Sequence, residues 1–360
     1  MTLTTATLSV RALRPRAWYG HVRASEDLFA AATDATRHDI VAGDGVLGGS
    51  KATRRAARSL RRWTSELQPP VSRPADLAVM WASDLGDVGE LLDVDPAWAD
   101  IGRTKVLVVS ECWPDDLTLH GPKVRALVEC FDIVVNCMEN DALRPLAGPG
   151  REVRHLPHAA VCESYAPMYG ARPVAVMNYG RRDPAQHDVL RSWATREGCW
   201  YHYDTTKLGP CDDPRDHQRV LGRLLSASTA SVCNLGRFDE AHRTGGASEL
   251  GARFYESLAA GCLLLGDFPE SPTFDAHFAD GPGLIPFPLG ADEVPPALLE
   301  LLADPAELAG VHRELRARAL AEHDIAHRLA TLLGFADAPV PPRLSARREA
   351  LVAEAAEVRP

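Results

Sequence analysis

Residues 237–267, RFDEAHRTGGASELGARFYESLAAGCLLLGD, carry the clearest fold signal in this sequence. Small residues at 244–248 predict a loop, and the amphipathic run 251–260 that follows predicts a short helix. After a turn at Gly261, the apolar run 262–265 predicts a buried strand that stops at Gly266. Loop, helix and strand in this order form half of an α/β crossover.

The start of this helix is a candidate anion site. The first N–H groups of a helix have no partner within it, and the helix dipole favours negative charge there. We therefore expect the N–H groups around Gly245 and Gly246 to hold a phosphate group. Glu256, one to two turns into the helix, would then reach a ribose hydroxyl, although it is also explained as a carboxylate on the face of an ordinary α/β unit.

Bulk properties exclude several classes of protein. A length of 360 residues suits two domains, and 46% hydrophobic with 24% charged residues is typical of a globular protein. No apolar run approaches the roughly 20 residues of a membrane helix, and the amino terminus lacks an apolar signal core, so we expect a cytoplasmic protein. The eight cysteines show no metal-ligand spacing, and the net charge of −10 argues against nucleic-acid binding.

The first half reads as a parallel sheet covered by helices. Short apolar runs separated by helix-length segments such as 122–130 predict strands at 8–11, 37–41, 76–81, 104–110, 131–136 and 153–157. A helix is predicted at 26–35. Ligands of such sheets lie beyond the carboxyl ends of the strands, which makes Glu111 and Trp113 candidate site residues.

A basic segment, residues 51–63, carries arginines on more than one face of a predicted helix. It is consistent with a patch for an anionic acceptor or lipid surface, or with a solvated helix beside the sheet.

The α/β pattern begins afresh in the second half. Strands are predicted at 173–179, 198–203, 230–235, 262–265 and 283–288, and helices at 185–196, 217–227, 291–303 and 313–333. Arg181 and Arg182 follow the first of these strands, where they suit either a phosphate group or a surface ion pair with Asp183 or Asp188. Arg237 and Arg253 are further phosphate candidates.

The run Glu256-Ser-Leu-Ala-Ala-Gly261-Cys-Leu263 resembles the carboxy-terminal half of retaining GT-B glycosyltransferases of family 1 and family 4, particularly the branch related to the spore protein CgeB. Ser248 stands where that family has the first of two glutamates, and Glu249 follows one residue late. The histidine that the family often has in the loop at Glu111 is missing here.

This resemblance implies a fold, a set of sites and a reaction. The fold is α/β, with two Rossmann-like domains facing a cleft: an acceptor domain at 1–168, a nucleotide-sugar domain at 169–335, and a tail or returning helix at 336–360. The implied site residues are Glu249, Ser248 and Glu111 for catalysis; Arg181, Arg237, Gly245, Gly246, Arg253 and Glu256 for the donor; and Trp113, His120 and His158 for the acceptor.

The implied function is metal-independent, retaining transfer of a sugar from a nucleotide-diphosphate sugar to a small-molecule or glycan acceptor. No cofactor is expected beyond the nucleotide sugar, and the composition fits bacterial secondary-metabolite or cell-envelope glycosylation. Two alternatives stay open: a nucleotide-sugar epimerase of the same fold, and a catalytically silent nucleotide- or sugar-binding protein.

Overall fold

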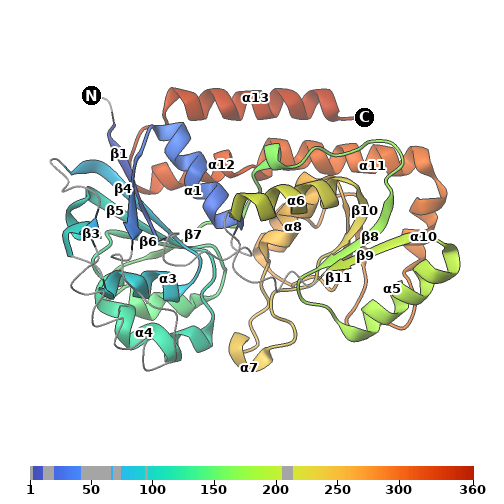
Figure 1. The fold of residues 1–360 in the computed structure, drawn as a ribbon, viewed down its shortest axis with the longest axis horizontal. Helices are drawn as coiled ribbons and strands as arrows, with labels where there is room; N and C mark the ends of the chain where they lie inside the picture. The colour runs from blue at the N-terminus through green and yellow to red at the C-terminus, as the bar shows by residue number, and fades with distance from the viewer. Residues whose placement is uncertain (1–2, 11–19, 42–65, 68–73, 94–95, 205–213) are drawn as a thin grey trace. The chain divides into compact units, whose positions relative to one another are not determined.

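The structure is a computed structural model that describes residues 3–10, 20–41, 66–67, 74–93, 96–204 and 214–360 (Figure 1). The predicted basic helix at 51–63 lies outside these residues. By the clustering of its contacts the chain divides into two compact units, one of Met1–Pro157 with Leu329–Leu344 and one of His158–Arg328 with Ser345–Pro360. The division falls at 157/158, whereas the sequence placed the boundary after residue 168.

The described part of unit 1 contains a seven-stranded sheet in the order β3-β2-β1-β4-β5-β6-β7. The strands are β1 (Thr5–Ser9), β2 (Thr36–Val41), β3 (Glu66–Leu67), β4 (Ala75–Ala82), β5 (Gly102–Val109), β6 (Ile133–Asn136) and β7 (Val153–His155). All neighbouring pairs are parallel except β2 with β3. The apolar runs form buried strands because helices cover them. Helix α1 (Gly20–Thr33) packs on β1 and β4. Helix α3 (Leu85–Gly89) packs on β4 and also contacts α4 (Pro114–Val128).

The described part of unit 2 contains a five-stranded parallel sheet in the order β12-β11-β10-β8-β9. Its strands are β8 (Val174–Tyr179), β9 (Trp200–Asp204), β10 (Ser228–Val232), β11 (Leu263–Gly266) and β12 (Leu284–Pro286). The helices that pack on them are α5 (Pro184–Glu197) on β9, α6 (Pro214–Ser226) on β10, and α8 (Ala252–Ala259) and α11 (Pro305–Arg318) on β11 (Figure 1). The predicted α/β class, with two units built on parallel sheets, is confirmed.

The described residues form five further α-helices. They are α7 (Ala241–Thr244), α9 (Pro272–His277), α10 (Pro296–Ala303), α12 (Ile325–Phe335) and α13 (Pro342–Val358), with 3-10 turns at Glu90–Asp93, Pro96–Asp100, Asp141–Leu146 and Cys162–Ser164. The segment predicted as a tail or returning helix is thus mostly helix α13. None of the described helices has both the length and the apolar character needed to span a bilayer.

The prediction of one long helix over 313–333 is wrong. The chain forms α11, a π-helical turn at Ala319–His323, and α12, with Asp324 in an extended conformation at the break. Asp324 is fully buried, and its carboxylate accepts the N–H groups of Cys162 at 2.9 Å and Ala326 at 2.9 Å. The backbone on either side of it also pairs with Ala160, so a distant segment interrupts the helix.

Candidate functional site

The carboxyl end of β8 meets the first turn of α8, which carries Arg253. Arg253 lies with its guanidinium carbon 4.6 Å from the centre of the Tyr179 ring, and its Nη1 donates to the carbonyl oxygen of Val232 at 3.3 Å. Gly180 makes this approach possible, because a Cβ there would lie 2.5 Å from Nη2 of Arg253. Its φ of +76° is also one that glycine adopts without strain. Arg253 therefore links the ends of β8 and β10.

Glu256 lies one turn further along α8 and is 6% exposed. Its Oε2 accepts a hydrogen bond from the Tyr179 hydroxyl at 3.0 Å. Burial, with the nearby Glu256 carboxylate, raises the pKa of Tyr179 well above its ordinary value, so this hydroxyl remains a donor at neutral pH. The carboxylate proposed to meet a ribose is thus held at the end of β8 by a tyrosine that the sequence analysis did not select.

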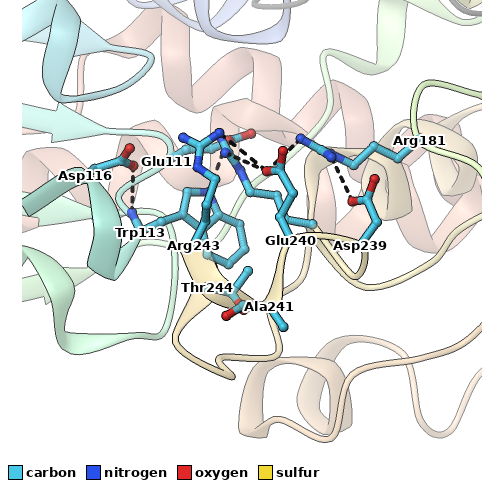
Figure 2. Close-up of polar contacts among 10 residues, drawn as sticks. Glu111, Trp113, Asp116, Arg181, Asp239, Glu240, Ala241, Arg243 and Thr244 are labelled. Carbon is cyan, nitrogen blue, oxygen red and sulfur yellow. Dashed lines mark hydrogen bonds and ion pairs between the residues drawn. The ribbon is translucent and has the colours of Figure 1, made fainter. Parts of the chain in front are cut away.

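Three arginines of unit 2 converge on one carboxylate oxygen, as Figure 2 shows for Arg181 and Arg243. Glu240 Oε2 accepts from Arg181 Nη2 at 3.0 Å, from Arg237 Nη1 at 3.2 Å and from Arg243 Nη1 at 3.4 Å. Arg181 also donates through Nη1 to Asp239 at 2.7 Å. We name Arg181, Arg237 and Arg243 the arginine cluster; Arg243 was not predicted.

The electrostatics of this group keep Glu240 ionised. Burial works to raise its pKa, but the charges of Arg181, Arg243 and Arg237 outweigh burial and hold that pKa below its ordinary value. The alternative for Arg181, a surface ion pair, involves carboxylates other than the predicted Asp183 or Asp188, because Arg181 pairs with Asp239 and Glu240.

The expected phosphate seat at Gly245 and Gly246 needs a correction. Gly245 has a φ of +60° and closes the short helix α7, with its N–H donating to the Ala241 carbonyl at 3.1 Å. The Gly246 N–H donates to the Thr244 hydroxyl at 3.2 Å. These amides are engaged within the turn, because α7 places a helix end where the sequence indicated only a loop. The next helix start is that of α8. Its N-cap residue is Gly251, which makes no side-chain capping hydrogen bond.

Ser248 and Glu249 lie on the chain between that turn and α8. Ser248 is partly exposed, whereas Glu249 is 3% exposed. The Glu249 carbonyl accepts the N–H of Gly236 at 2.8 Å, which closes the segment 236–249 into a loop. Of the two predicted sugar-contacting residues, only Ser248 is partly accessible to solvent. His158, a predicted acceptor residue, is buried at the start of this unit.

In unit 1 the predicted residues follow β5. Trp113 is 2% exposed; its backbone N–H donates to Asp116 at 2.9 Å (Figure 2), and its indole Nε1 donates to Glu111 at 3.4 Å. Glu111 thus orients a covered indole ring. His120, expected in a loop, lies within α4, which begins at Pro114 rather than near Pro122 and includes that second proline.

Sequence reasoning missed two groups near the ends of the strands in unit 1. His21 approaches Ser110 at the end of β5, with 3.2 Å between Nε2 and Oγ. Arg23 is 2% exposed and pairs with Glu26 at 3.4 Å and with Asp87 at 3.7 Å. Both basic residues belong to the first turns of α1, which the apolar pattern had placed only from Glu26 onward.

The cysteines and the metal-ligating side chains form no further site among the described residues. The seven cysteines that the structure describes are all free thiols. Within the described ranges, no three His, Cys, Asp or Glu residues gather in a way that could hold a metal ion.

Comparisons with known proteins bear on this site. A family profile described as glycosyl transferase-like matches residues 193–334. These include Arg237, Glu240, Arg243, Arg253 and Glu256. A search of the curated proteins finds no match.

Three solved structures have a partly similar chain path, and two of them, AviGT4 and GtfA, are described as a glycosyltransferase and an O-GlcNAc transferase. TarM, which a second structure assigns to S. aureus, has a TM-score of 0.44 and 10% identity, covering 72% of this chain and 54% of its own. AviGT4, involved in Avilamycin A biosynthesis, has a TM-score of 0.43 and 12% identity, covering 98% of each chain. The pneumococcal O-GlcNAc transferase GtfA, in complex with UDP and GlcNAc, has a TM-score of 0.35 and 14% identity, covering 88% and 61%. The chain spans about half the length of TarM.

Proposed function

We propose that this chain is a cytoplasmic GT-B glycosyltransferase of the CgeB-related branch, which transfers a sugar from a nucleotide-diphosphate sugar to an acceptor. The observation that carries the proposal is the gathering of Arg181, Arg237 and Arg243 beyond the strand ends of unit 2. Ligands of open α/β sheets bind at such ends. Most of these residues lie within the segment that the glycosyl transferase-like profile matches.

The proposed sugar transfer mainly requires stabilisation of the departing nucleoside diphosphate. Its negative charge grows as the glycosidic bond breaks, and fixed cationic donors are the most effective way to stabilise it. Arginine stays charged at any physiological pH and can donate two hydrogen bonds to phosphate oxygens. Arg181, Arg237 and Arg253 would supply this without a metal ion, and Glu256 would bind the ribose.

The remaining roles in the proposal follow the resemblance. Ser248 or Glu249 contacts the transferred sugar, Glu111 acts in catalysis, and Trp113, His120 and His158 serve the acceptor side. The anomeric configuration is retained, as in the resembled family.

Binding of nucleoside diphosphates, measured by calorimetry over a panel of bases, tests the donor site. Replacing Arg181 by alanine should weaken the best binder by about 10- to 100-fold, the loss expected for hydrogen bonds to a charged group. Arg191→Ala is the matched control, since the Arg191 side chain is exposed on α5 and pairs with the exposed Asp188. Equal affinities for the two variants would refute the proposed donor site.

Measurements of turnover distinguish the proposed transferase from the epimerase and from the catalytically silent protein. Release of nucleoside diphosphate that depends on an added acceptor supports the transferase. Formation of an epimer from the nucleotide sugar alone supports the epimerase, and binding without release under any acceptor supports the silent protein.

A further inference from the structure

The carboxylate of Glu240 occupies the position in which the arginine cluster would receive an anion. A single oxygen, Oε2, accepts from all three guanidinium groups at 3.0 to 3.4 Å. Arg181 also uses its other Nη on Asp239, so both donors of its fork meet carboxylates from the same short segment. A phosphate group offers the same guanidinium groups the same kind of oxygen acceptor.

The arginine cluster and Glu240 are partly buried. The side chains of Arg237, Arg243 and Glu240 are 17%, 29% and 24% exposed, so water only partly shields the charges of the group.

The position of Glu240 at the start of α7 gives a second indication. A residue at this N-cap position commonly turns its side-chain oxygen back to accept a helix N–H. Glu240 makes no such bond, and its carboxylate points to the arginines instead. Its backbone is held separately, because its N–H donates to Arg237 and its carbonyl accepts from Arg243, both at 2.8 Å. The side chain can therefore leave the cluster by rotating its own bonds.

The segment that carries Glu240 is bounded by left-handed residues. Arg237, with a φ of +52°, precedes it, and Gly245 and Gly246, at +60° and +81°, follow it. A non-glycine residue in this region is uncommon and is strained, and such residues concentrate at ligand-binding sites. Arg237 is such a residue, and its guanidinium belongs to the cluster.

We propose that the Glu240 carboxylate is a stand-in for the donor diphosphate, which means that it occupies the place of the phosphate groups. It holds the arginine cluster in shape when the site is empty and must be displaced when the diphosphate binds. This inference rests on the proposed function and adds a carboxylate that competes with the donor. Arg243, which the sequence analysis did not select, becomes a diphosphate-binding residue. Asp239 competes for Arg181 alone and has a smaller effect.

Inorganic pyrophosphate is the probe that tests this, because it carries the shared chemistry without a base or sugar. Its affinity is measured by calorimetry at low ionic strength for the full chain and for Glu240→Gln, which keeps the shape of the side chain and removes its charge. We expect Glu240→Gln to bind pyrophosphate about tenfold more tightly. In this variant pyrophosphate no longer has to displace a carboxylate from its hydrogen bonds with the arginine cluster. Glu197→Gln on α5 removes one exposed carboxylate elsewhere in the unit and should leave the affinity within about twofold.

Two further variants keep the result interpretable. Glu240→Ala removes the side chain entirely and should also bind more tightly, and thermal unfolding of each variant shows that it is folded. Arg243→Ala should weaken pyrophosphate binding in the Glu240→Gln background.

Affinity that is unchanged or weaker in both Glu240 variants would overturn the stand-in, because Glu240 would then only brace the arginines. If the unaltered chain binds pyrophosphate through Arg181 while Glu240→Gln brings no gain, the stand-in fails and the donor site survives. If neither binds pyrophosphate or any nucleoside diphosphate, both proposals fail.

Discussion

Replacing Asp324 by alanine should destabilise unit 2 more than any change at its exposed ion pairs. The carboxylate is fully buried, and it accepts from the N–H groups of Cys162 and Ala326, each at 2.9 Å. Its Oδ2 also lies 3.4 Å from Nη2 of Arg347 on α13. One side chain thus joins the chain that enters unit 2, the break before α12, and the carboxy-terminal helix.

The magnitude follows from what alanine leaves behind. Two buried N–H groups lose their acceptor, at about 1–3 kcal/mol each. The guanidinium of Arg347 loses its buried partner as well, and breaking such a pair costs about 3–5 kcal/mol. These terms overlap because they share one carboxylate, so we expect a total of about 3–5 kcal/mol for Asp324→Ala. Asp324→Asn keeps one acceptor oxygen and should lose about half as much.

The second ion pair of Arg347, with Glu163, provides the matched control. Its other donor, Nη1, meets Glu163 at 2.7 Å, and the Glu163 side chain is 63% exposed. Glu163→Gln should therefore cost no more than about 1 kcal/mol.

Urea unfolding followed by tryptophan fluorescence and by circular dichroism gives the three free energies of unfolding. The reasoning is refuted if Asp324→Ala and Glu163→Gln lower stability equally, since the difference is predicted from burial alone.

Two further predictions concern acid stability and glycine. Burial, with Arg328 nearby, lowers the pKa of His323 to about 2, so unfolding takes up a proton below pH 6.5 and stability falls as the pH is lowered. His323→Phe should therefore shrink the loss in unfolding free energy between pH 7 and pH 5 by about 2 kcal/mol; an unchanged pH profile would contradict this. Gly310→Ala, in open space on α11, should raise stability by up to about 1 kcal/mol, whereas Gly266→Ala should lower it by about 1–3 kcal/mol because its Cβ overlaps the Cys233 carbonyl oxygen; melting curves that rank the two alike would refute the packing argument.

Much of the fold follows from short-range pattern. The strands predicted at 76–81 and 173–179 are found at Ala75–Ala82 and Val174–Tyr179, and the helix predicted at 251–260 is α8. Each of these is a continuous apolar or amphipathic run bounded by turn residues, so neighbours in sequence carry the whole signal. Gly261, with a φ of +64°, makes the predicted turn between α8 and β11.

The site follows only partly from such pattern. The sequence selected Arg181 and Arg237 because they follow predicted strands, and Arg253 and Glu256 because they lie in the first turns of the predicted helix. It did not select Glu240, Tyr179 or Arg243. Arg181 and Glu240 are 59 residues apart in the chain, and no local rule pairs them.

By itself, then, the sequence determined two α/β halves, the positions of most strands and the loop-helix-strand unit at residues 237–267, because these depend on periodicity within a few turns of chain. Other features depend on the tertiary structure. The helix is interrupted at Asp324, whose carboxylate accepts the N–H of Cys162. The Gly245 and Gly246 amides close a turn, and three arginines share one oxygen of Glu240. These outcomes depend on which distant groups folding brings within hydrogen-bond range, where burial makes each partner choice costly to change.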